Sequence, residues 1–499
     1  MSRDVHHGGH RGHGAEPLDL SPRGGWGATS HLVFLCVLCV LCGESSVFAQ
    51  EGDWAAHRGG PARTGNVDGK PGPAQAKVLW VYRSKEQFVA PPAAAGDRLF
   101  VVVMGAFNTG ALRVFDLNQG KAPVWSKGAP IVRLPTVGTP AVAGGKVVFG
   151  EGMHQTDGSS LHCMRASDGR SLWRLDVAGE LVHIEAAPSI AGGRAFVGGG
   201  SAGVLCVEMA LVTLDGKDLS IAEAEGEIEK KWKAMADAYE IDKKKDPDFA
   251  IPPNEANLPK PAPRLVWQKG KGAWHVDAPV LVAKDRVYVA SAYLDKERLG
   301  ERALLCLNAA DGAEIWKAPL KFNAWGGATL AGDLLIVPSS TMRYDPKELS
   351  SAKGEVVALK ASDGSVAWRR DAAGAVLATV AAVGDLAVIC DTSGQVVALD
   401  AKSGQPRWTY KGGHPFFAGA AVGGDAVYAA DIEGVVHAVG LADGKSRWKL
   451  DLGADPVKAP GMVYGSPVVH GGRLYVATSN LEGKAAGGET VIVCIGEGK

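Results

Sequence analysis

The sequence predicts an all-β protein, an eight-bladed β-propeller of four-stranded antiparallel blades with one helical insertion. A segment ending in Gly-x-x-x-Trp recurs along the chain, and most of its tryptophans are spaced by 40 to 52 residues, the length of a four-stranded blade. Glycine is abundant, at 66 of 499 residues, whereas aromatic residues make up 7%. This balance is typical of short strands joined by many tight turns.

The N-terminal region predicts export. Residues 32–42, LVFLCVLCVLC, form an apolar run of 11 residues, which is too short to span a bilayer comfortably and matches the core of a signal peptide. We expect residues 1–49 to be a leader and signal peptide cleaved after Ala49, where small residues precede the bond; an uncleaved anchor is the alternative. The mature chain is then periplasmic or in the cell envelope, without a membrane span. Residues 50–74 would form an N-terminal extension and residues 75–499 the propeller.

Eight tryptophans mark the blades. Five segments superimpose without gaps, namely RASDGRSLW, NAADGAEIW, KASDGSVAW, DAKSGQPRW and GLADGKSRW. A looser copy, DLNQGKAPVW, and two strand-like pieces, KVLW and RLVW, keep the tryptophan. The turn glycine suits a positive φ, and an indole is large enough to fill the wedge between neighbouring sheets. The expected blade anchors are Trp80, Trp125, Trp173, Trp267, Trp316, Trp368, Trp408 and Trp448.

One spacing between consecutive anchor tryptophans is about twice the length of a blade. Trp173 and Trp267 are 94 residues apart, yet the sequence between them holds strands for only one blade. Residues 218–248 carry 16 charged side chains around an apolar stripe with helical spacing, and residues 251–263 contain five prolines. We therefore expect an insertion over residues 218–263, a helix followed by an extended return. The stripe could pack on the propeller or dock a separate partner.

The two ends of the repeat are complementary. The last 51 residues supply three strands and no terminal tryptophan strand, whereas KVLWVYR, residues 77–83, has no blade of its own. Pairing the two closes the ring and removes the free sheet edges. Eight blades result.

Cysteines and charge exclude several classes of protein. Five cysteines follow the leader, and their wide spacing fits neither a disulfide framework nor a zinc pair. Four of them, Cys163, Cys206, Cys306 and Cys494, align with small residues in the third strand of other blades, which predicts a buried apolar position. A formal net charge of −1 gives no reason to expect a nucleic-acid partner.

The repeat resembles the pyrroloquinoline quinone (PQQ) propeller family, whose blades end in the pattern seen here as VVALDAKSGQPRW. The segment DWAAHRGGPARTG, residues 53–65, also resembles a signature that opens many exported members. The resemblance covers residues 75–499 and implies a PQQ-type propeller, similar to the propeller subunit of the outer-membrane β-barrel assembly machinery. That likeness implies an exported module that binds protein partners through its loops.

Propellers bind ligands at the mouth of the central channel, on the loops that enter the innermost strands. When the eight units are aligned, polar side chains gather at equivalent positions of three successive blades, while the remaining blades carry mostly apolar residues. Carboxylates beside imidazoles could coordinate a metal or hold a polar ligand, or they could only satisfy one another. The candidate ligand-binding residues are His183, Glu185, His275, Asp277, Asn323 and Trp325.

Two functions follow from these observations. The first is a protein-binding or scaffolding module of the cell envelope, a monomer with envelope proteins as partners, without a cofactor and without catalytic residues. The second is a dehydrogenase that depends on PQQ and calcium. The chain has no adjacent cysteine pair and no Cys-x-x-Cys-His haem site, features that the resemblance associates with many such enzymes. Hydrolase and nucleotide-binding motifs are also absent from the sequence.

Overall fold

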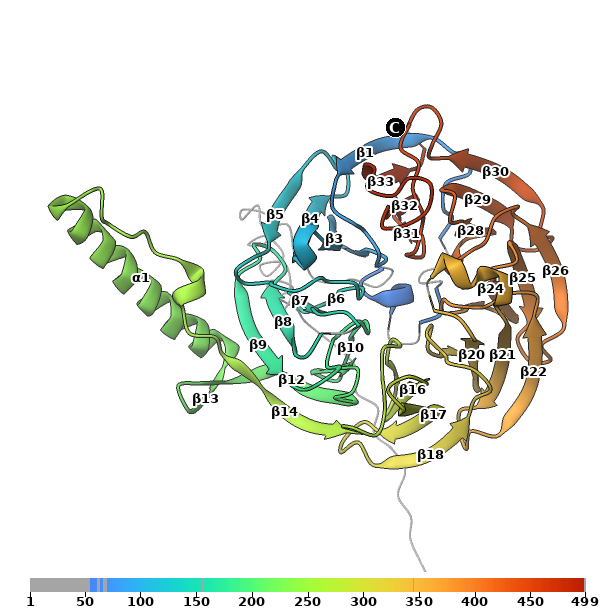
Figure 1. Cartoon of the computed structure of the whole chain (residues 1–499), viewed down its shortest axis with the longest axis horizontal. Helices are drawn as coiled ribbons and strands as arrows, with labels where there is room; N and C mark the ends of the chain where they lie inside the picture. The colour runs from blue at the N-terminus through green and yellow to red at the C-terminus, as the bar shows by residue number, and fades with distance from the viewer. Residues whose placement is uncertain (1–53, 61–62, 66–69, 155, 344, 498–499) are drawn as a thin grey trace, which may run out of the picture. The chain divides into compact units, whose positions relative to one another are not determined.

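A computed structural model describes residues 54–60, 63–65, 70–154, 156–343 and 345–497. The predicted signal peptide, its cleavage after Ala49 and the alternative of an uncleaved anchor concern residues outside this part of the chain. The described strands form eight sheets arranged as blades around a central axis (Figure 1), which confirms the predicted propeller.

Each blade is an antiparallel meander whose first strand lies nearest the axis. Blades 1 and 2 contain β2 (Ala93–Ala95), β3 (Arg98–Met104), β4 (Gly110–Asp116) and β5 (Pro123–Lys127), then β6 (Ala141–Ala143), β7 (Lys146–Gly150), β8 (Ser159–Arg165) and β9 (Ser171–Val177). Blades 3 and 4 contain β10 (Ser189–Ala191), β11 (Arg194–Gly198), β12 (Val204–Leu214), β13 (Lys217–Ser220) and β14 (Ala262–Lys269), then β15 (Leu281–Ala283), β16 (Arg286–Leu294), β17 (Leu299–Asn308) and β18 (Glu314–Pro319).

The second half of the ring repeats this order. Blades 5 and 6 contain β19 (Thr329–Ala331), β20 (Leu334–Ser340), β21 (Gly354–Lys360) and β22 (Val366–Ala372), then β23 (Ala381–Val383), β24 (Leu386–Cys390), β25 (Gln395–Asp400) and β26 (Pro406–Lys411). Blades 7 and 8 contain β27 (Ala421–Gly423), β28 (Ala426–Ala430), β29 (Val435–Gly440) and β30 (Ser446–Asp451), then β31 (Val468–His470), β32 (Arg473–Ala477), β33 (Thr490–Ile495) and β1 (Val78–Ser84). Four short 3₁₀ helices lie at His57–Gly59, Ala106–Asn108, Glu255–Asn257 and Pro346–Ser351.

Blade 8 joins the two ends of the repeat. Strand β1 pairs antiparallel with β33, and Trp80 lies opposite Cys494. Figure 1 shows the N-terminal β1 beside the C-terminal β33. The closure inferred from the orphan tryptophan strand is therefore present, and no blade among the described residues is left without its outer strand.

The tryptophans link each blade to the next one. All eight lie on the outermost strand, opposite a buried residue of the third strand, as Trp368 lies opposite Ala358. The Trp368 indole N–H donates to the carbonyl of Ala401 in the following blade at 3.0 Å. Gly404 of the same turn has a φ of +70°, and a Cβ there would lie 2.6 Å from the Trp368 ring. One recurring segment thus supplies both the indole and the glycine that receives its neighbour's indole.

Trp173 is the exception to this pattern. The other seven anchors donate their indole N–H to a backbone carbonyl, at distances between 2.8 and 3.3 Å. The Trp173 Nε1 is buried and has no partner among the described residues. The reason lies in blade 3, where β12 runs on to Leu214 and removes the turn that would supply the carbonyl. The insertion therefore interrupts one of the interblade contacts.

The insertion forms an arm on the outside of blades 2 and 3. It starts with β13, a fifth strand that the four-stranded prediction did not include, and continues as helix α1 (Ile221–Lys245). The side chain of Ser220 accepts from the backbone N–H of Glu223, and the Glu223 carboxylate accepts in return, so a capping box fixes the start of the helix. Figure 1 shows the helix projecting away from the ring.

Only the first turns of α1 pack on the propeller. Ala224 and Ile228 are buried, and Glu229 pairs with Arg170 of blade 2 at 3.0 Å. Beyond Trp232 the apolar stripe is only half-buried. The first half of the stripe therefore packs on the propeller, as one of the two alternatives expected.

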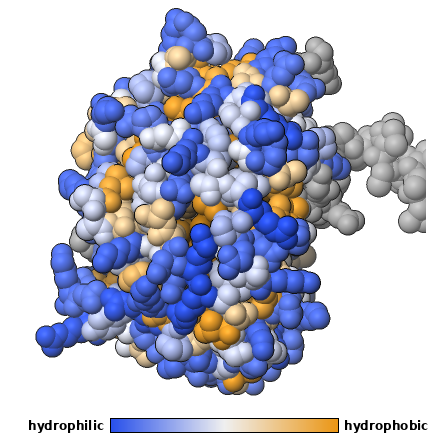
Figure 2. All heavy atoms as spheres, turned by 90° about the vertical axis from the view of Figure 1, so that its right-hand side faces the viewer, coloured by the Kyte–Doolittle hydropathy of each residue, from blue (hydrophilic) through white to orange (hydrophobic). Residues whose placement is uncertain are grey.

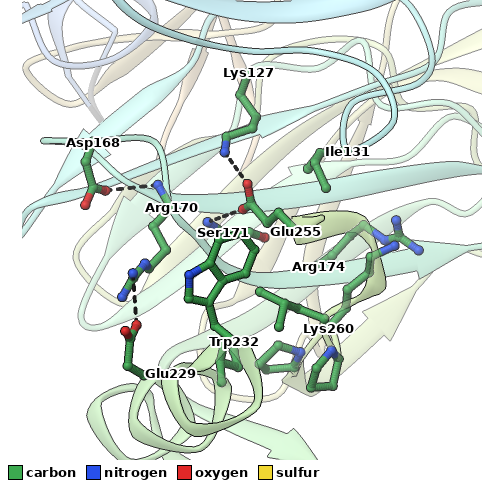
Figure 3. Close-up of a pocket in the computed structure, with 14 residues that line it drawn as sticks. Lys127, Ile131, Asp168, Arg170, Ser171, Arg174, Glu229, Trp232, Glu255 and Lys260 are labelled. Atoms are coloured by element: carbon green, nitrogen blue, oxygen red, sulfur yellow. Dashed lines mark hydrogen bonds and ion pairs between the residues drawn. The ribbon is translucent and has the colours of Figure 1, made fainter. Parts of the chain in front are cut away.

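A groove of about 240 Å³ lies between α1, the returning segment and the wall of blade 2. Figure 3 shows the Trp232 indole in this groove, near the Glu255 carboxylate, which is 2.5 Å from the ammonium of Lys127. No helix of the described residues is long and apolar enough to cross a membrane.

The outer wall away from the arm is polar. Figure 2 shows the side of the ring that carries β22, β26 and β30, where hydrophilic side chains predominate and apolar ones are scattered. The apolar residues are instead buried between blades, and the cysteines predicted for the third strand are buried and free.

Candidate functional site

A segment near the N-terminus lies in the central channel. The backbone of Trp54 pairs with Ala94 of blade 1, and the amide of Val142 in blade 2 donates to the carbonyl of Ala55. On the far side of the channel the amide of Ala382 in blade 6 donates to the carbonyl of Thr64. This channel segment, residues 54–60 and 63–65, connects the inner strands of blades that are distant in sequence. The sequence analysis had recognised its motif but had not predicted its position.

Arg63 anchors the channel segment to blades 3 and 4. Its side chain is fully buried, and its guanidinium donates to the carbonyls of Val280 and Ala187 at 2.6 and 3.1 Å and to the hydroxyl of Ser189 at 2.9 Å. Burial lowers the pKa of Arg63 to about 9. Backbone carbonyls thus hold this charge in place of a carboxylate.

Arg58 and His57 complete the segment. Arg58 is also buried and donates to the carbonyl of Ala420 in blade 7. The two ring nitrogens of His57 lie 3.2 and 2.9 Å from the hydroxyls of Thr139 and Thr379, which belong to blades 2 and 6. Burial and the two nearby guanidinium groups lower the pKa of His57 well below its ordinary value. His57 therefore remains a neutral ring on the channel axis.

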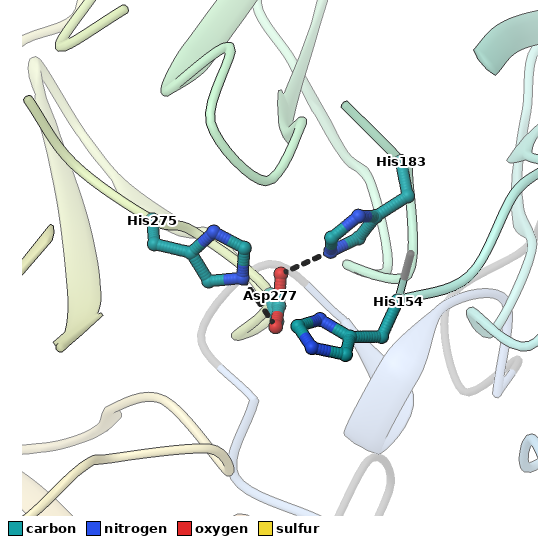
Figure 4. A group of neighbouring side chains, drawn as sticks. All are labelled: His154, His183, His275 and Asp277. Carbon is teal, nitrogen blue, oxygen red and sulfur yellow. Dashed lines mark hydrogen bonds and ion pairs between the residues drawn. The ribbon is translucent and has the colours of Figure 1, made fainter. Parts of the chain in front are cut away.

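Two histidines and an aspartate meet above this segment. His183 and Glu185 precede the first strand of blade 3, and His275 and Asp277 precede that of blade 4. Asp277 accepts from both rings, with its two oxygens 2.9 Å from the Nε2 atoms of His183 and His275 (Figure 4). The sequence had predicted these four residues on one arc, and the structure brings them together because equivalent positions of adjacent blades are neighbours.

His154 joins this cluster although the sequence analysis missed it. It lies in the loop between β7 and β8, which spans residues 151–158, and its ring centroid is 5.6 Å from that of His183 and 6.1 Å from that of His275. The backbone N–H of His154 donates to the carboxylate of Glu185. The corresponding loop in blade 6 spans only residues 391–394, so the extra length was the available signal.

Arg343 is a further residue that the sequence analysis did not single out. It lies in the long loop between β20 and β21, stacks on the ring of Trp325 with 4.5 Å between guanidinium carbon and ring centroid, and approaches Asp277 to 3.8 Å. Asn323 lies at its predicted position before the first strand of blade 5. Its amide donates to and accepts from the backbone of Tyr293 at 3.0 and 2.9 Å, so it also fixes the neighbouring loop.

The opposite side of the mouth is apolar, as the sequence alignment indicated. Leu377, Phe417 and Tyr464 pack together with Trp325 in one hydrophobic cluster. A cavity of about 180 Å³ lies between the two arcs. Its lining includes Glu185, Asp277, Trp325, Arg343 and Tyr464, and His57 of the channel segment. The mouth is therefore a small cup with one charged wall and one apolar wall.

The two carboxylates of the cup have opposite pKa shifts. Burial alone would raise the pKa of Asp277, but its contacts with His183 and His275 outweigh burial and hold the pKa well below its usual range. Burial and the neighbouring Asp277 charge raise the pKa of Glu185. Burial, with Arg343 nearby, lowers the pKa of His154 to about 4. Asp277 therefore carries the fixed negative charge of the site.

The eight-bladed fold and its recurring Gly-x-x-x-Trp segment define a PQQ-repeat β-propeller. A family model described as outer membrane protein assembly factor BamB matches residues 54–222, 260–415 and 412–493. The chain belongs to this family. The model's match leaves out residues 223–259, which make up most of the arm. No curated protein matches the chain.

Solved structures of two kinds share the fold. BamB from Moraxella catarrhalis is 15% identical, with a TM-score of 0.54, and the match covers 84% of this chain and 97% of that one. A europium-containing methanol dehydrogenase is 13% identical, with a TM-score of 0.58 and coverage of 89% and 98%. A quinohemoprotein alcohol dehydrogenase from Comamonas testosteroni is 12% identical, with a TM-score of 0.56 and coverage of 91% and 82%. At these identities the likeness shows the fold alone.

Proposed function

We propose that this chain is an exported propeller that binds protein partners in the cell envelope through its arm. The observation that carries the proposal is the exposure of large apolar side chains at the tip of the arm. Phe249 is 83% exposed and Ile251 is 82% exposed, and Ile241 near the end of α1 is 55% exposed. Phe249 and Ile251 are two positions apart, and a group of exposed large apolar side chains is the kind of surface that a partner covers.

The groove at the base of the arm extends this contact surface. Its lining includes the apolar residues Ile131, Trp232 and Leu258, and Lys260 lies among them. Burial, followed by the nearby Arg174 and Arg133, lowers the pKa of Lys260, so cations lie close together at this end of the groove. A partner segment that combines apolar and acidic side chains fits this chemistry.

Site-specific crosslinking tests the proposal. A photoreactive residue at position 249 should give discrete adducts with another envelope protein in the producing cell, whereas the same residue at position 315 should not. Ile315 is a suitable control because it is an exposed apolar residue, 44% accessible, on the outer strand β18. The double variant Phe249→Ser/Ile251→Ser should abolish the adducts of a probe at position 241. Equal adducts at positions 249 and 315, or none at either, would contradict a partner-binding arm.

Export needs a separate test. The proposal places the mature chain in the periplasm or cell envelope, with Gln50 as its first residue. Cell fractionation followed by mass spectrometry of the N-terminal peptide checks both points. A protein that stays in the cytoplasm with its leader intact would refute the location.

A dehydrogenase that uses PQQ and calcium is the second candidate, favoured by the fold shared with such enzymes. Calcium requires six to eight oxygen ligands. Both oxygens of Asp277 accept hydrogen bonds from histidines, Glu185 accepts one from the backbone of His154, and the Asn323 amide is bound to Tyr293. The donor set is rich in nitrogen and its oxygens are engaged, so the residues present do not fit calcium.

The dehydrogenase reading is tested directly. The full chain is titrated with PQQ and calcium while its fluorescence is followed, and dye reduction is then assayed with alcohols and sugars. We expect neither saturable binding nor turnover. Calcium-dependent dye reduction that is lost in Asp277→Asn would overturn this expectation and favour the enzyme.

A further inference from the structure

We propose that His154, His183, His275 and Asp277 form a binding site for a divalent transition-metal ion, with zinc as the ion used to test it. The inference goes beyond the partner-binding proposal, since it concerns the channel mouth and not the arm. It rests on the convergence of four potential ligands in one cluster, on buried ring nitrogens without partners, and on the charge of the surroundings.

The four side chains converge from three separate segments. His154 comes from a loop of blade 2, His183 from the segment entering blade 3, and the other two from the segment entering blade 4. One candidate ligand atom from each lies within 4.8 Å of the others. The three rings meet at angles of 62°, 76° and 89°, so they surround a point and do not stack. Figure 4 shows the rings grouped around the Asp277 carboxylate.

One nitrogen of each imidazole ring lacks a hydrogen-bond partner among the described residues. His183 and His275 are fully buried, and each uses Nε2 to contact Asp277. The Nδ1 atoms of His154, His183 and His275 are buried and have no hydrogen-bond partner among the described residues. A buried polar atom without a partner is costly, and three such atoms in one cluster are unusual. A metal ion that accepts a lone pair from each ring would give the cluster bonds that its own side chains do not form.

The donor set identifies the class of ion. Imidazole nitrogens suit zinc, copper, nickel and iron, whereas calcium and magnesium prefer oxygen. Ligand atoms held about 2.0 to 2.1 Å from a zinc ion lie no more than about 4 Å apart. The present limit of 4.8 Å therefore requires at least one side chain to move inward by about 1 Å, which a small ring rotation achieves.

The surroundings add one carboxylate and one cation. Glu185 lies 4.0 Å from the His183 ring and accepts from the backbone of His154, so it contributes negative charge and orients that loop. Arg343 lies 3.8 Å from Asp277 and opposes a bound cation, but a third of its side chain is exposed and it can turn away. His154 is only half-buried, which leaves the ion accessible from the cavity. Four protein ligands fill a tetrahedral coordination sphere, so a zinc ion held by all four side chains would be of the closed, structural type.

Metal binding is measured on the full purified chain. The protein is stripped with a chelator, dialysed, and titrated with zinc by calorimetry, with calcium as the control ion. One zinc ion per chain is expected with a Kd below about 1 μM, and cobalt should give the visible absorption of a tetrahedral nitrogen-rich site. Calcium should not bind. Failure to bind zinc at this stoichiometry would overturn the proposal.

Variants separate a metal site from a hydrogen-bonded network. His275→Asn and His154→Asn should each weaken zinc binding by at least about 100-fold. The matched control is His437→Asn, because His437 is also buried and pairs with a buried aspartate, Asp431, at 3.0 Å, outside the cluster. This control should lose stability and keep the zinc affinity of the wild type. Equal zinc affinity in His275→Asn and the wild type would refute the site.

Arg343→Gln provides a second test of zinc binding in case the buried histidine variants do not fold. The substitution lies at a partly exposed position and removes the cation nearest to Asp277, so zinc should bind several-fold more tightly. A purely structural network predicts no change in zinc affinity in this variant. Unchanged affinity in Arg343→Gln together with unchanged affinity in His154→Asn would count against the metal site.

Discussion

Gly404 offers a direct test of the contact that joins the blades. Its φ of +70° lies in the left-handed region, and a Cβ at this position would lie 2.6 Å from two carbons of the Trp368 ring. Gly384 provides a matched control, because its φ of +57° is equally unfavourable but nothing lies within 4 Å of its added Cβ. The difference between the two alanine variants therefore isolates the contact with tryptophan.

The expected magnitudes follow from these two terms. A left-handed alanine costs about 1 to 2 kcal/mol, and overpacking against a fixed ring adds about 1 to 3 kcal/mol. Gly404→Ala should then lose about 2 to 5 kcal/mol and Gly384→Ala only about 1 to 2 kcal/mol. For a chain of this size, 1 kcal/mol shifts Tm by about 1 °C.

Thermal unfolding and urea titration measure both variants. In the Trp368→Leu background, the smaller side chain leaves room for the new methyl group, so the extra cost of Gly404→Ala should disappear. If Gly404→Ala and Gly384→Ala lost equal stability in the wild-type background, the glycine would be selected by backbone conformation alone. The proposal that the neighbouring indole requires a glycine at this position of the repeat would then be wrong.

Three further predictions concern the channel and the blade anchors. Arg63→Met should accelerate hydrogen exchange at the amide of Ala382 at least about tenfold, because the channel segment that accepts this hydrogen bond loses its anchor. Trp173→Phe should cost about 1 kcal/mol less than Trp368→Phe, since only the Trp368 indole N–H has a partner to lose. Between pH 7.5 and 5.5 the wild type should lose about 1.4 kcal/mol more unfolding free energy than His57→Asn.

The pH prediction has a definite sign. The pKa of His57 is lowered in the folded state, so the unfolded state binds more protons below pH 6.5 and stability falls as the pH falls. Identical pH dependence in the wild type and His57→Asn would contradict it. For the channel, Arg407→Met is the control, because Arg407 is a half-exposed arginine that pairs with Asp385 and Asp400, away from the channel segment. For the anchors, equal losses in the two phenylalanine variants would show that the missing hydrogen bond is immaterial.

The blades could be predicted because their information is local. The turn glycine, the third-strand residue and the tryptophan lie within a few positions of one another, and each copy repeats the same solution. The arc of His183, Glu185, His275 and Asp277 could be predicted for a related reason, since aligned positions in consecutive blades are adjacent in a ring. Repetition thus turned a sequence alignment into a set of spatial neighbours.

The remaining features depend on contacts that do not repeat. His154 reaches the cluster from the loop between β7 and β8, and the length of that loop does not tell which of its side chains faces the channel. Asn323 occupies a predicted position, yet its amide forms hydrogen bonds with the backbone of Tyr293. No pattern in the sequence predicts those hydrogen bonds. The channel segment is irregular, and its arginines bind carbonyls whose position only the closed ring determines. Such features can be identified only in the folded structure.

The shared blade has a consequence for biosynthesis. Strand β1 is among the first parts of the propeller to be synthesised and its partner β33 is the last, so every other blade is complete before the ring can lock. Until then β1 keeps an unpaired edge that carries Trp80, and such an edge can pair with other chains and promote aggregation. A chain delivered through a membrane with its N-terminus first would stay loose during passage and would become rigid only on arrival.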